Sequence, residues 1–140
     1  MRKRFLSMLL ALCLTLTLVP QAFAVSDSGS NDSLQTAQPV SLGDSISGKI
    51  SPKGDVDFYS FQLTQSGKVT LDMKAYMEYY SLLLYDSSGE RIWYDDYNQW
   101  TESVGFRNDT YHLFLEKGTY YLQVKGSVWK DGDSNYSGKY

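Results

Sequence analysis

Residues 54–63 read Gly-Asp-Val-Asp-Phe-Tyr-Ser-Phe-Gln-Leu, and this stretch decides the fold class. The odd-numbered side chains from Asp57 to Leu63 fall on one side of an extended chain, because successive residues of a strand point to opposite faces. Three of those four side chains are large and mostly apolar, and a Gly-Asp turn precedes them. The stretch therefore predicts a β-strand with one buried face.

The same period of two recurs on both sides of this stretch, and turn residues separate the segments. Asp86-Ser87-Ser88-Gly89 is typical of a tight hairpin turn, and Lys117-Gly118 marks another turn. Residues 33–38 fit a single helical turn. We expect strands at 45–50, 57–63, 68–73, 81–85, 91–94, 111–115 and 119–125, with a weaker signal over 100–106. This spacing predicts an all-β fold, an antiparallel jelly-roll-like β-sandwich of about eight short strands over residues 39–140.

The first 24 residues have the composition of a secretory signal peptide. A basic start at residues 2–4 precedes an apolar run at 5–19, and Ala22-Phe23-Ala24 is a small-x-small cleavage motif. We expect cleavage after Ala24 and a secreted, extracellular product. An uncleaved membrane anchor is the alternative, but it needs about 20 apolar residues. Cys13, the single cysteine, leaves with this leader, so the mature chain has no disulfide and no thiol nucleophile.

Charge and composition narrow the partner classes. The chain carries 13 basic and 16 acidic residues, a net charge of −3, and three of the basic residues lie in the leader. An acidic mature chain argues against nucleic acid and against an anionic membrane, because both require clustered Lys or Arg. We therefore expect an extracellular protein or polysaccharide polymer as partner. Residues 25–38 are small and polar, and we expect a flexible lead-in there.

Several motifs together resemble the bacterial pre-peptidase C-terminal domains, a group that includes the collagen-binding domains of clostridial collagenases. Residues 54–61 are similar to the strand motif of that family. The resemblance implies a jelly-roll-like β-sandwich, usually attached to secreted peptidases and other hydrolases and itself without catalytic activity. The other matching motifs follow in the family's order: Asn31-Asp32, Leu42-Gly43-Asp44, Ile46-x-Gly48, Leu83 to Gly89, Gly118 to Val124, and the closing Ser137-Gly138-Lys139-Tyr140.

Four oxygen-bearing side chains, Asn31, Asp32, Asp55 and Asp57, form a candidate calcium site. Asp55 and Asp57 stand two residues apart, so on a strand they project to the same side. Calcium takes six to eight oxygen ligands, and a loop beside a strand start can supply them. The family resemblance implies calcium between the N-terminal linker and this turn, although serines replace the linker acids expected just before Asn31. The alternative is that the aspartates cap the turn by accepting backbone N–H bonds.

Nothing in the sequence forms a catalytic constellation. His112 is the single histidine, and no Gly-x-Ser-x-Gly nucleophile motif is present. On a strand, His112 shares a face with Phe114, which indicates a surface or half-buried side chain. We therefore expect a protein that is not an enzyme.

Aromatic residues are dense between positions 76 and 100, and a small sandwich cannot bury all of them. Exposed Tyr and Trp rings are favoured at interfaces, and their flat faces stack on sugars or proline-rich strands. Alternation sends one ring of Trp93-Tyr94 inward and the other outward. The candidate ligand-binding residues are Tyr79, Trp93, Tyr94, Tyr97 and Trp100.

The sequence thus predicts a secreted, non-catalytic binding module for an extended extracellular polymer, with calcium as a stabilising ion. The family resemblance suggests a collagen-like protein strand or a cell-surface ligand. Two alternatives stay open. Coplanar Trp93 and Trp100 would favour a carbohydrate-binding module, and a partner peptidase found in the culture medium would favour an accessory domain for secretion or assembly.

Overall fold

The strand predicted from residues 57–63 is present as β5 (Val56–Leu63). The computed structural model describes residues 22–51, 55–77, 80–96, 106–126 and 138–140. Tyr59 and Leu63 lie buried on the inner face of β5, only 1% and 5% exposed. Ser60 and Gln62 alternate with them and are more exposed. The period of two in the sequence therefore identified the inner face correctly, but Phe58 on the opposite face is buried as well.

One layer of the fold is a five-stranded sheet in the order β2–β5–β10–β7–β8. All of its neighbouring strands are antiparallel except β2 and β5, which run parallel. A bulge near Leu84 and Tyr85 shifts the register between β7 and β8. The bounds are β2 (Gln38–Pro39), β7 (Tyr80–Tyr85), β8 (Arg91–Asp96) and β10 (Gly118–Gly126).

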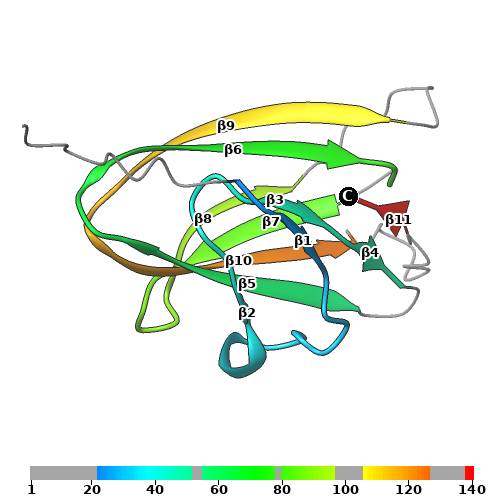
Figure 1. Cartoon of the computed structure of the whole chain (residues 1–140), viewed down its shortest axis with the longest axis horizontal. Helices are drawn as coiled ribbons and strands as arrows, with labels where there is room; N and C mark the ends of the chain where they lie inside the picture. Colours follow the sequence, from blue (N-terminus) through cyan, green and yellow to red (C-terminus); the bar gives the residue numbers. More distant parts are fainter. Residues whose placement is uncertain (1–21, 52–54, 78–79, 97–105, 127–137) are drawn as a thin grey trace, which may run out of the picture.

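The second layer consists of three strand pairs (Figure 1). The last strand, β11, belongs to one of these pairs and also bonds to the segments next to the other two. Backbone bonds join Gly48 and Tyr140 in both directions, and the Tyr76 N–H donates to the Lys139 carbonyl at 2.8 Å. Because of these bonds, β11 lies between β4 on one side and β6 on the other. One pair is parallel and consists of β1 (Ala24–Ser26) and β3 (Ser45–Ser47). The other two pairs are antiparallel: β4 (Lys49–Ile50) with β11 (Gly138–Lys139), and β6 (Gly67–Ala75) with β9 (Arg107–Leu115).

The core lies between the two layers and draws side chains from both. The strand arrangement agrees with the predicted sandwich: in the described part of the chain, the regular elements are strands apart from one 3₁₀ turn, η1 (Leu34–Thr36). Burial of these apolar side chains is the main stabilising contribution to such a fold. One buried cluster contains Ile50, Tyr59, Met73, Ala75, Met77, Tyr80, Leu82 and Val124, and the other Leu63, Leu84, Leu115, Tyr120 and Leu122.

The polar segment 25–38 is part of the sandwich, in contrast to the predicted flexible lead-in. It contains β1, η1 and β2, and Asn31 within it is fully buried. Its small polar side chains form hydrogen bonds. Ser33 and Thr36 form a capping box at η1, which lies where the sequence predicts a single helical turn. The polar composition of this segment therefore reflects the hydrogen bonds that fix it, and not a lack of structure.

Some predictions concern residues outside the described ranges. Positions 1–21 of the predicted signal peptide lie there, as do positions 100–105 of the weakest predicted strand, of which Phe106 alone is described and precedes β9. In the described part of the chain, no helix combines the length and apolar character that a bilayer crossing requires.

Candidate functional site: an acidic cluster and an aromatic sheet face

The predicted acidic residues meet at the start of β5. Asp32, Asp55 and Asp57 each place one carboxylate oxygen within 4.8 Å of the others. Asp32 lies on the N-terminal segment and is exposed, whereas Asp57 is only 1% exposed. Residues more than twenty positions apart in the sequence are thus brought to one point. We call Asp32, Asp55 and Asp57 the acidic cluster.

Asn31 holds the N-terminal segment against β5. Its main-chain carbonyl accepts from the Phe58 N–H at 2.7 Å, and its side-chain amide donates to the Phe58 carbonyl at 3.2 Å. The side-chain oxygen of Asn31 accepts from the Ser28 hydroxyl at 3.4 Å. Asn31, predicted as a metal ligand, therefore uses its side chain within the protein and positions the neighbouring Asp32.

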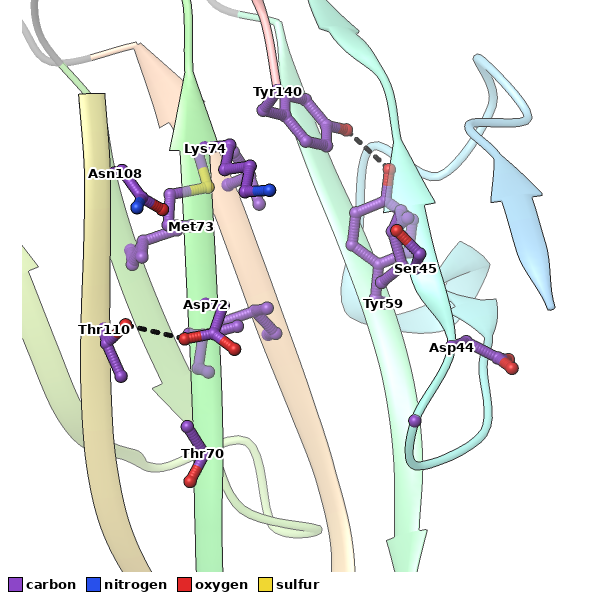
Figure 2. A pocket seen from close by; sticks show the side chains of 16 residues that line it. Asp44, Ser45, Tyr59, Thr70, Asp72, Met73, Lys74, Asn108, Thr110 and Tyr140 are labelled. Carbon is purple, nitrogen blue, oxygen red and sulfur yellow. Dashed lines mark hydrogen bonds between the residues drawn. The ribbon is translucent and has the colours of Figure 1, made fainter. Parts of the chain in front are cut away.

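Asp57 stands in an unusual environment for a carboxylate. Its inner side is covered by Tyr140, whose hydroxyl donates to it, and Tyr140 in turn is hydrogen-bonded to the Tyr59 hydroxyl at 2.5 Å (Figure 2). Burial raises the pKa of Asp57 to about 6, and the Tyr140 hydrogen bond offsets part of that rise. The charges of Asp27, Asp55 and Asp32 add to the rise. Ionised Asp57 is therefore a buried charge surrounded by like charges.

The tyrosines beside Asp57 remain protonated and act as donors. Burial is the main reason that the pKa of Tyr140 and that of Tyr59 lie far above the ordinary value of 10. Tyr59 also lies 3.4 Å from a carboxylate oxygen of Asp27. Asp27 is thus a fourth acid at this end of the sandwich, contributed by the segment that was predicted to be short of linker acids.

Asp55 fits both interpretations that the sequence left open. Its carboxylate accepts from the Ser51 N–H at 2.6 Å, which is the predicted turn-capping bond. Asp57 does not cap the turn, since its partner is Tyr140. Three converging carboxylate oxygens are the kind of donor that calcium prefers, so the residues present fit the ion.

The outer face of the five-stranded sheet carries a second candidate site. Strand register aligns Phe58, Gln123, Leu83 and Tyr94 in one row across β5, β10, β7 and β8. The neighbouring row pairs Tyr121 with Tyr85. We call Phe58, Leu83, Tyr85, Tyr94 and Tyr121 the aromatic face.

The inner part of this aromatic face is rigid and its outer part is accessible. Phe58 and Tyr85 pack with ring centroids 6.0 Å apart, and the Tyr85 hydroxyl donates to Gln123 at 2.9 Å. Tyr94 at the sheet edge is 60% exposed, and the Arg91 guanidinium lies 4.9 Å from its ring centroid. Phe58 and Leu83 are buried, so the accessible part of the aromatic face is Tyr94 together with the half-buried Tyr85 and Tyr121. Rings of this kind are suited to contact a flat or extended ligand.

Of the predicted ligand residues, the structure describes Trp93 and Tyr94 and separates them. Tyr94 points outward, whereas Trp93 is half-buried, packs against both core clusters and meets Tyr111 at 5.2 Å between ring centroids. Trp93 is therefore a core residue and not the surface contact that we predicted. The coplanar Trp pair of the carbohydrate-binding alternative loses one member for this reason. Tyr79, Tyr97 and Trp100 lie outside the described residues.

The single histidine is a surface residue of the other sheet. His112 and Phe114 are both exposed on β9, on the shared face that alternation predicts. His112 lies 3.3 Å from the Thr70 hydroxyl across the β6–β9 pair. This contact is a cross-strand surface pair of ordinary kind.

Comparison with known structures finds proteins of similar fold. The 1.0 Å crystal structure of the pre-peptidase C-terminal domain of collagenase from Bacillus anthracis is similar, with a TM-score of 0.50 and 17% sequence identity. The match covers 74% of this chain and 90% of that domain. The chain has the fold of a pre-peptidase C-terminal domain. No protein-family model and no curated protein sequence matches the chain.

The pre-peptidase C-terminal fold is what the sequence motifs had suggested, and two of the three residues of the acidic cluster, Asp55 and Asp57, lie in the segment whose sequence carried that resemblance. At 17% identity the likeness concerns the fold. The ligand of this pre-peptidase C-terminal fold has to be argued from its own side chains.

Proposed function

We propose that this protein is an extracellular, non-catalytic binding domain that holds an extended polymer across the aromatic face. The observation that carries the proposal is Tyr94, a ring 60% exposed at the end of a row whose other members are packed and fixed. A ring already held by a neighbouring Arg91 loses little conformational freedom on binding. Rigid aromatic contacts of this kind supply most of the energy at many interfaces.

A collagen-like protein strand is the first polymer to test. The structurally similar domain comes from a collagenase. An extended protein strand can lie along neighbouring aromatic rings without contacts that depend on its sequence. The inward position of Trp93 weakens the polysaccharide alternative. An accessory role beside a secreted peptidase agrees with the same similarity and does not exclude polymer binding.

Calcium at the acidic cluster forms part of this proposal. The ion would neutralise the charges of Asp32, Asp55 and Asp57, and would join the N-terminal segment to the start of β5. It would supply positive charge and fixed geometry, not chemistry on a substrate. Backbone carbonyls and water would complete the six to eight ligands that calcium requires.

The test is a binding assay of the secreted protein on immobilised collagen, gelatin and insoluble polysaccharides, with matched aromatic variants. Tyr94→Ala should weaken binding to the bound polymer at least tenfold. Phe114→Ala is the control, because Phe114 is 75% exposed but lies on β9 in the other layer. Equal binding by both variants, or binding to none of the polymers, contradicts the proposal.

Secretion can be tested on the same preparation. If the leader is cleaved after Ala24, the mass of the protein in the medium corresponds to a chain that starts at Val25. That cleavage removes the Ala24–Ser45 pair of β1 and leaves the pairs of Val25 and Ser26 with β3. A product that retains residues 1–24 would contradict the predicted secretion signal.

A further inference from the structure

Two exposed aromatic rings pack against each other where β6 ends and β9 begins. Tyr76 follows β6 and is 63% exposed, and Phe106 precedes β9 and is 54% exposed. Their ring centroids lie 5.2 Å apart, and the ring planes are inclined at 51°. Because each ring holds the other in place, a ligand that contacts them removes little conformational freedom.

Three exposed lysines flank this ring pair, and they come from distant parts of the chain. The Lys139 carbonyl accepts from the Tyr76 N–H at 2.8 Å, so Lys139 on β11 lies next to Tyr76. Lys49 on β4 is paired with Lys139. Lys74 stands two residues before Tyr76 and projects to the same face of the chain. Figure 2 shows its side chain extending away from Asn108 of β9, toward the side of β11.

Lys49 and Lys139 form a like-charged pair at a position where side chains of two strands approach closely. The neighbouring residues, Gly48 and Tyr140, exchange both of their backbone hydrogen bonds. Hydrogen-bonded and non-hydrogen-bonded pairs alternate in an antiparallel ladder, so the two lysines form a non-hydrogen-bonded pair, with Cα atoms about 4.5 Å apart. Like charges directly opposite each other destabilise a strand pair. An anionic group between the two ammonium groups would remove this repulsion.

The lysines and the rings form one row on the outer face of the second layer. The row crosses β4, β11, β6 and β9, which lie in this order at one end of the molecule (Figure 1). At a strand spacing of about 4.8 Å, its four members span about 14 Å. The whole chain has a net charge of −3, so this group of lysines is a local exception that the fold creates. We call Lys49, Lys74, Lys139, Tyr76 and Phe106 the basic–aromatic patch.

We propose that the basic–aromatic patch binds an acidic polysaccharide, a sugar chain that carries carboxylate or sulfate groups. The apolar face of a sugar ring stacks on Tyr76 and Phe106, and the anionic group lies between Lys49 and Lys139. Lysine is a compact point charge with three donors, so it suits either anion. An acidic peptide matches the lysines equally well but has no sugar ring for the aromatic pair. The patch lies on the opposite layer from the aromatic face, so the two sites act independently.

The test measures binding of the secreted protein to immobilised polygalacturonate and dextran sulfate by biolayer interferometry. Methyl-esterified polygalacturonate and plain dextran have the same sugar rings without the charge, and polyglutamate has the charge without the rings. Saturable binding is expected to at least one acidic polysaccharide, and its neutral counterpart and polyglutamate should bind at least tenfold more weakly. Binding should also weaken as salt is added, because the lysines are exposed and salt screens their charge. The two acidic polymers together distinguish a carboxylate from a sulfate ligand.

Matched variants locate the site. Lys139→Gln and Tyr76→Ala should each weaken binding at least fivefold. Lys68→Gln is the charge control, because Lys68 is an exposed lysine of β6 that stands eight residues before Tyr76. Tyr94→Ala is the aromatic control on the other layer. Both controls should bind the acidic polysaccharide as the parent does, whether or not Tyr94→Ala has lost the polymer proposed for the aromatic face.

Lys49→Gln separates a lost ligand contact from a damaged fold. It removes one charge of the like-charged pair, so at low salt its melting temperature should equal or exceed that of the parent, while its affinity for the polysaccharide falls severalfold.

Four results overturn the proposal. The first is the absence of saturable binding to both acidic polysaccharides. The second is equal binding to polyglutamate, which would assign the patch to an acidic peptide. The third is an equal loss of affinity in Lys68→Gln and Lys139→Gln, which would show that overall charge alone is involved. The fourth is a lower melting temperature for Lys49→Gln at low salt, which would assign this lysine to balancing the chain's own acidic residues.

Discussion

Replacing Asp57 with Asn tests the acidic cluster most directly. Asp57→Asn keeps a side-chain oxygen that can accept the Tyr140 hydroxyl, so the hydrogen bond survives while the charge is removed. The parent carboxyl is 1% exposed and has a pKa of about 6, against 3.8 for an unperturbed Asp. The variant therefore isolates the cost of the buried charge.

The sign and size of the effect follow from the raised pKa. Between about pH 4 and pH 6 the folded protein keeps a proton on Asp57 that the unfolded chain has lost, so the free energy of unfolding falls as pH rises through this window. At 1.36 kcal/mol per pKa unit, the loss above pH 6 amounts to about 3 kcal/mol. Asp57→Asn does not suffer this loss of stability, because an amide side chain does not ionise. In the absence of calcium at pH 7.5, the variant should be the more stable protein, whereas at pH 4 the two should be similar.

Calcium should reverse this order. An ion that binds the native state alone adds about 2.7 kcal/mol of stability at one hundred times its Kd. The parent, with three carboxylates in the cluster, should gain this stabilisation, and Asp57→Asn should gain much less. The parent's gain should also diminish as pH falls below about 6, because protonated Asp57 does not ligate calcium.

Thermal melting at pH 4, 5, 6 and 7.5, with calcium or with chelator, measures all of these quantities. About 1 kcal/mol corresponds to roughly 4 °C for a domain of this size, so the chelator difference at pH 7.5 should approach 10 °C. Asp72→Asn is the matched control, because Asp72 is an exposed acid on β6 outside the cluster. Two results refute the reasoning: a variant less stable than the parent in chelator at pH 7.5, or equal calcium shifts in both.

Three further substitutions test the packing around these sites by chemical denaturation. Tyr140→Phe removes the donor to buried Asp57 and should cost about 1–3 kcal/mol at pH 7.5, whereas Tyr94→Phe at an exposed position should change stability by less than about 0.5 kcal/mol. Leu82→Ala empties a side-chain position that is 0% exposed and should cost about 2–5 kcal/mol, while Phe114→Ala on the surface should be nearly neutral. Gly138→Ala would bring a Cβ within 2.5 Å of the Tyr76 carbonyl oxygen, so it should displace β11; a wild-type midpoint for this variant would contradict the position of β11 between β4 and β6.

Much of the sandwich could be predicted because its signals are local. In β10, Tyr120, Leu122 and Val124 alternate with more polar residues, and all three are buried as the period of two requires. The turn at residues 86–89 was equally clear: Asp86 accepts from the Ser88 and Glu90 N–H groups, and Gly89 takes a φ of 83°. These features depend on neighbours within a few positions.

What could not be predicted depends on contacts between distant residues. Tyr140 and Asp57 are 83 positions apart, and nothing near either residue signals their hydrogen bond. The side-chain amide of Asn31 donates to the Phe58 carbonyl, 27 positions away, and no local pattern signals that bond. The sequence predicts both Trp93 and Tyr94 as ligand residues. Alternation on a strand shows that one of the two rings points inward, but it does not show which one. The direction was decided by the register of β8 on β7.

A single strand, β5, positions both features of the candidate site. Its inward side chains Asp57 and Tyr59 contact Tyr140, and Asp57 also belongs to the acidic cluster. Its outward Phe58 lies at the inner end of the aromatic face. A substitution on β5 that abolishes binding would therefore not by itself identify a ligand contact, since β5 supports the cluster and the aromatic face together. Side chains elsewhere separate these possibilities: Tyr94 on β8 reports on the aromatic face, and Asp32 on the N-terminal segment reports on the ion.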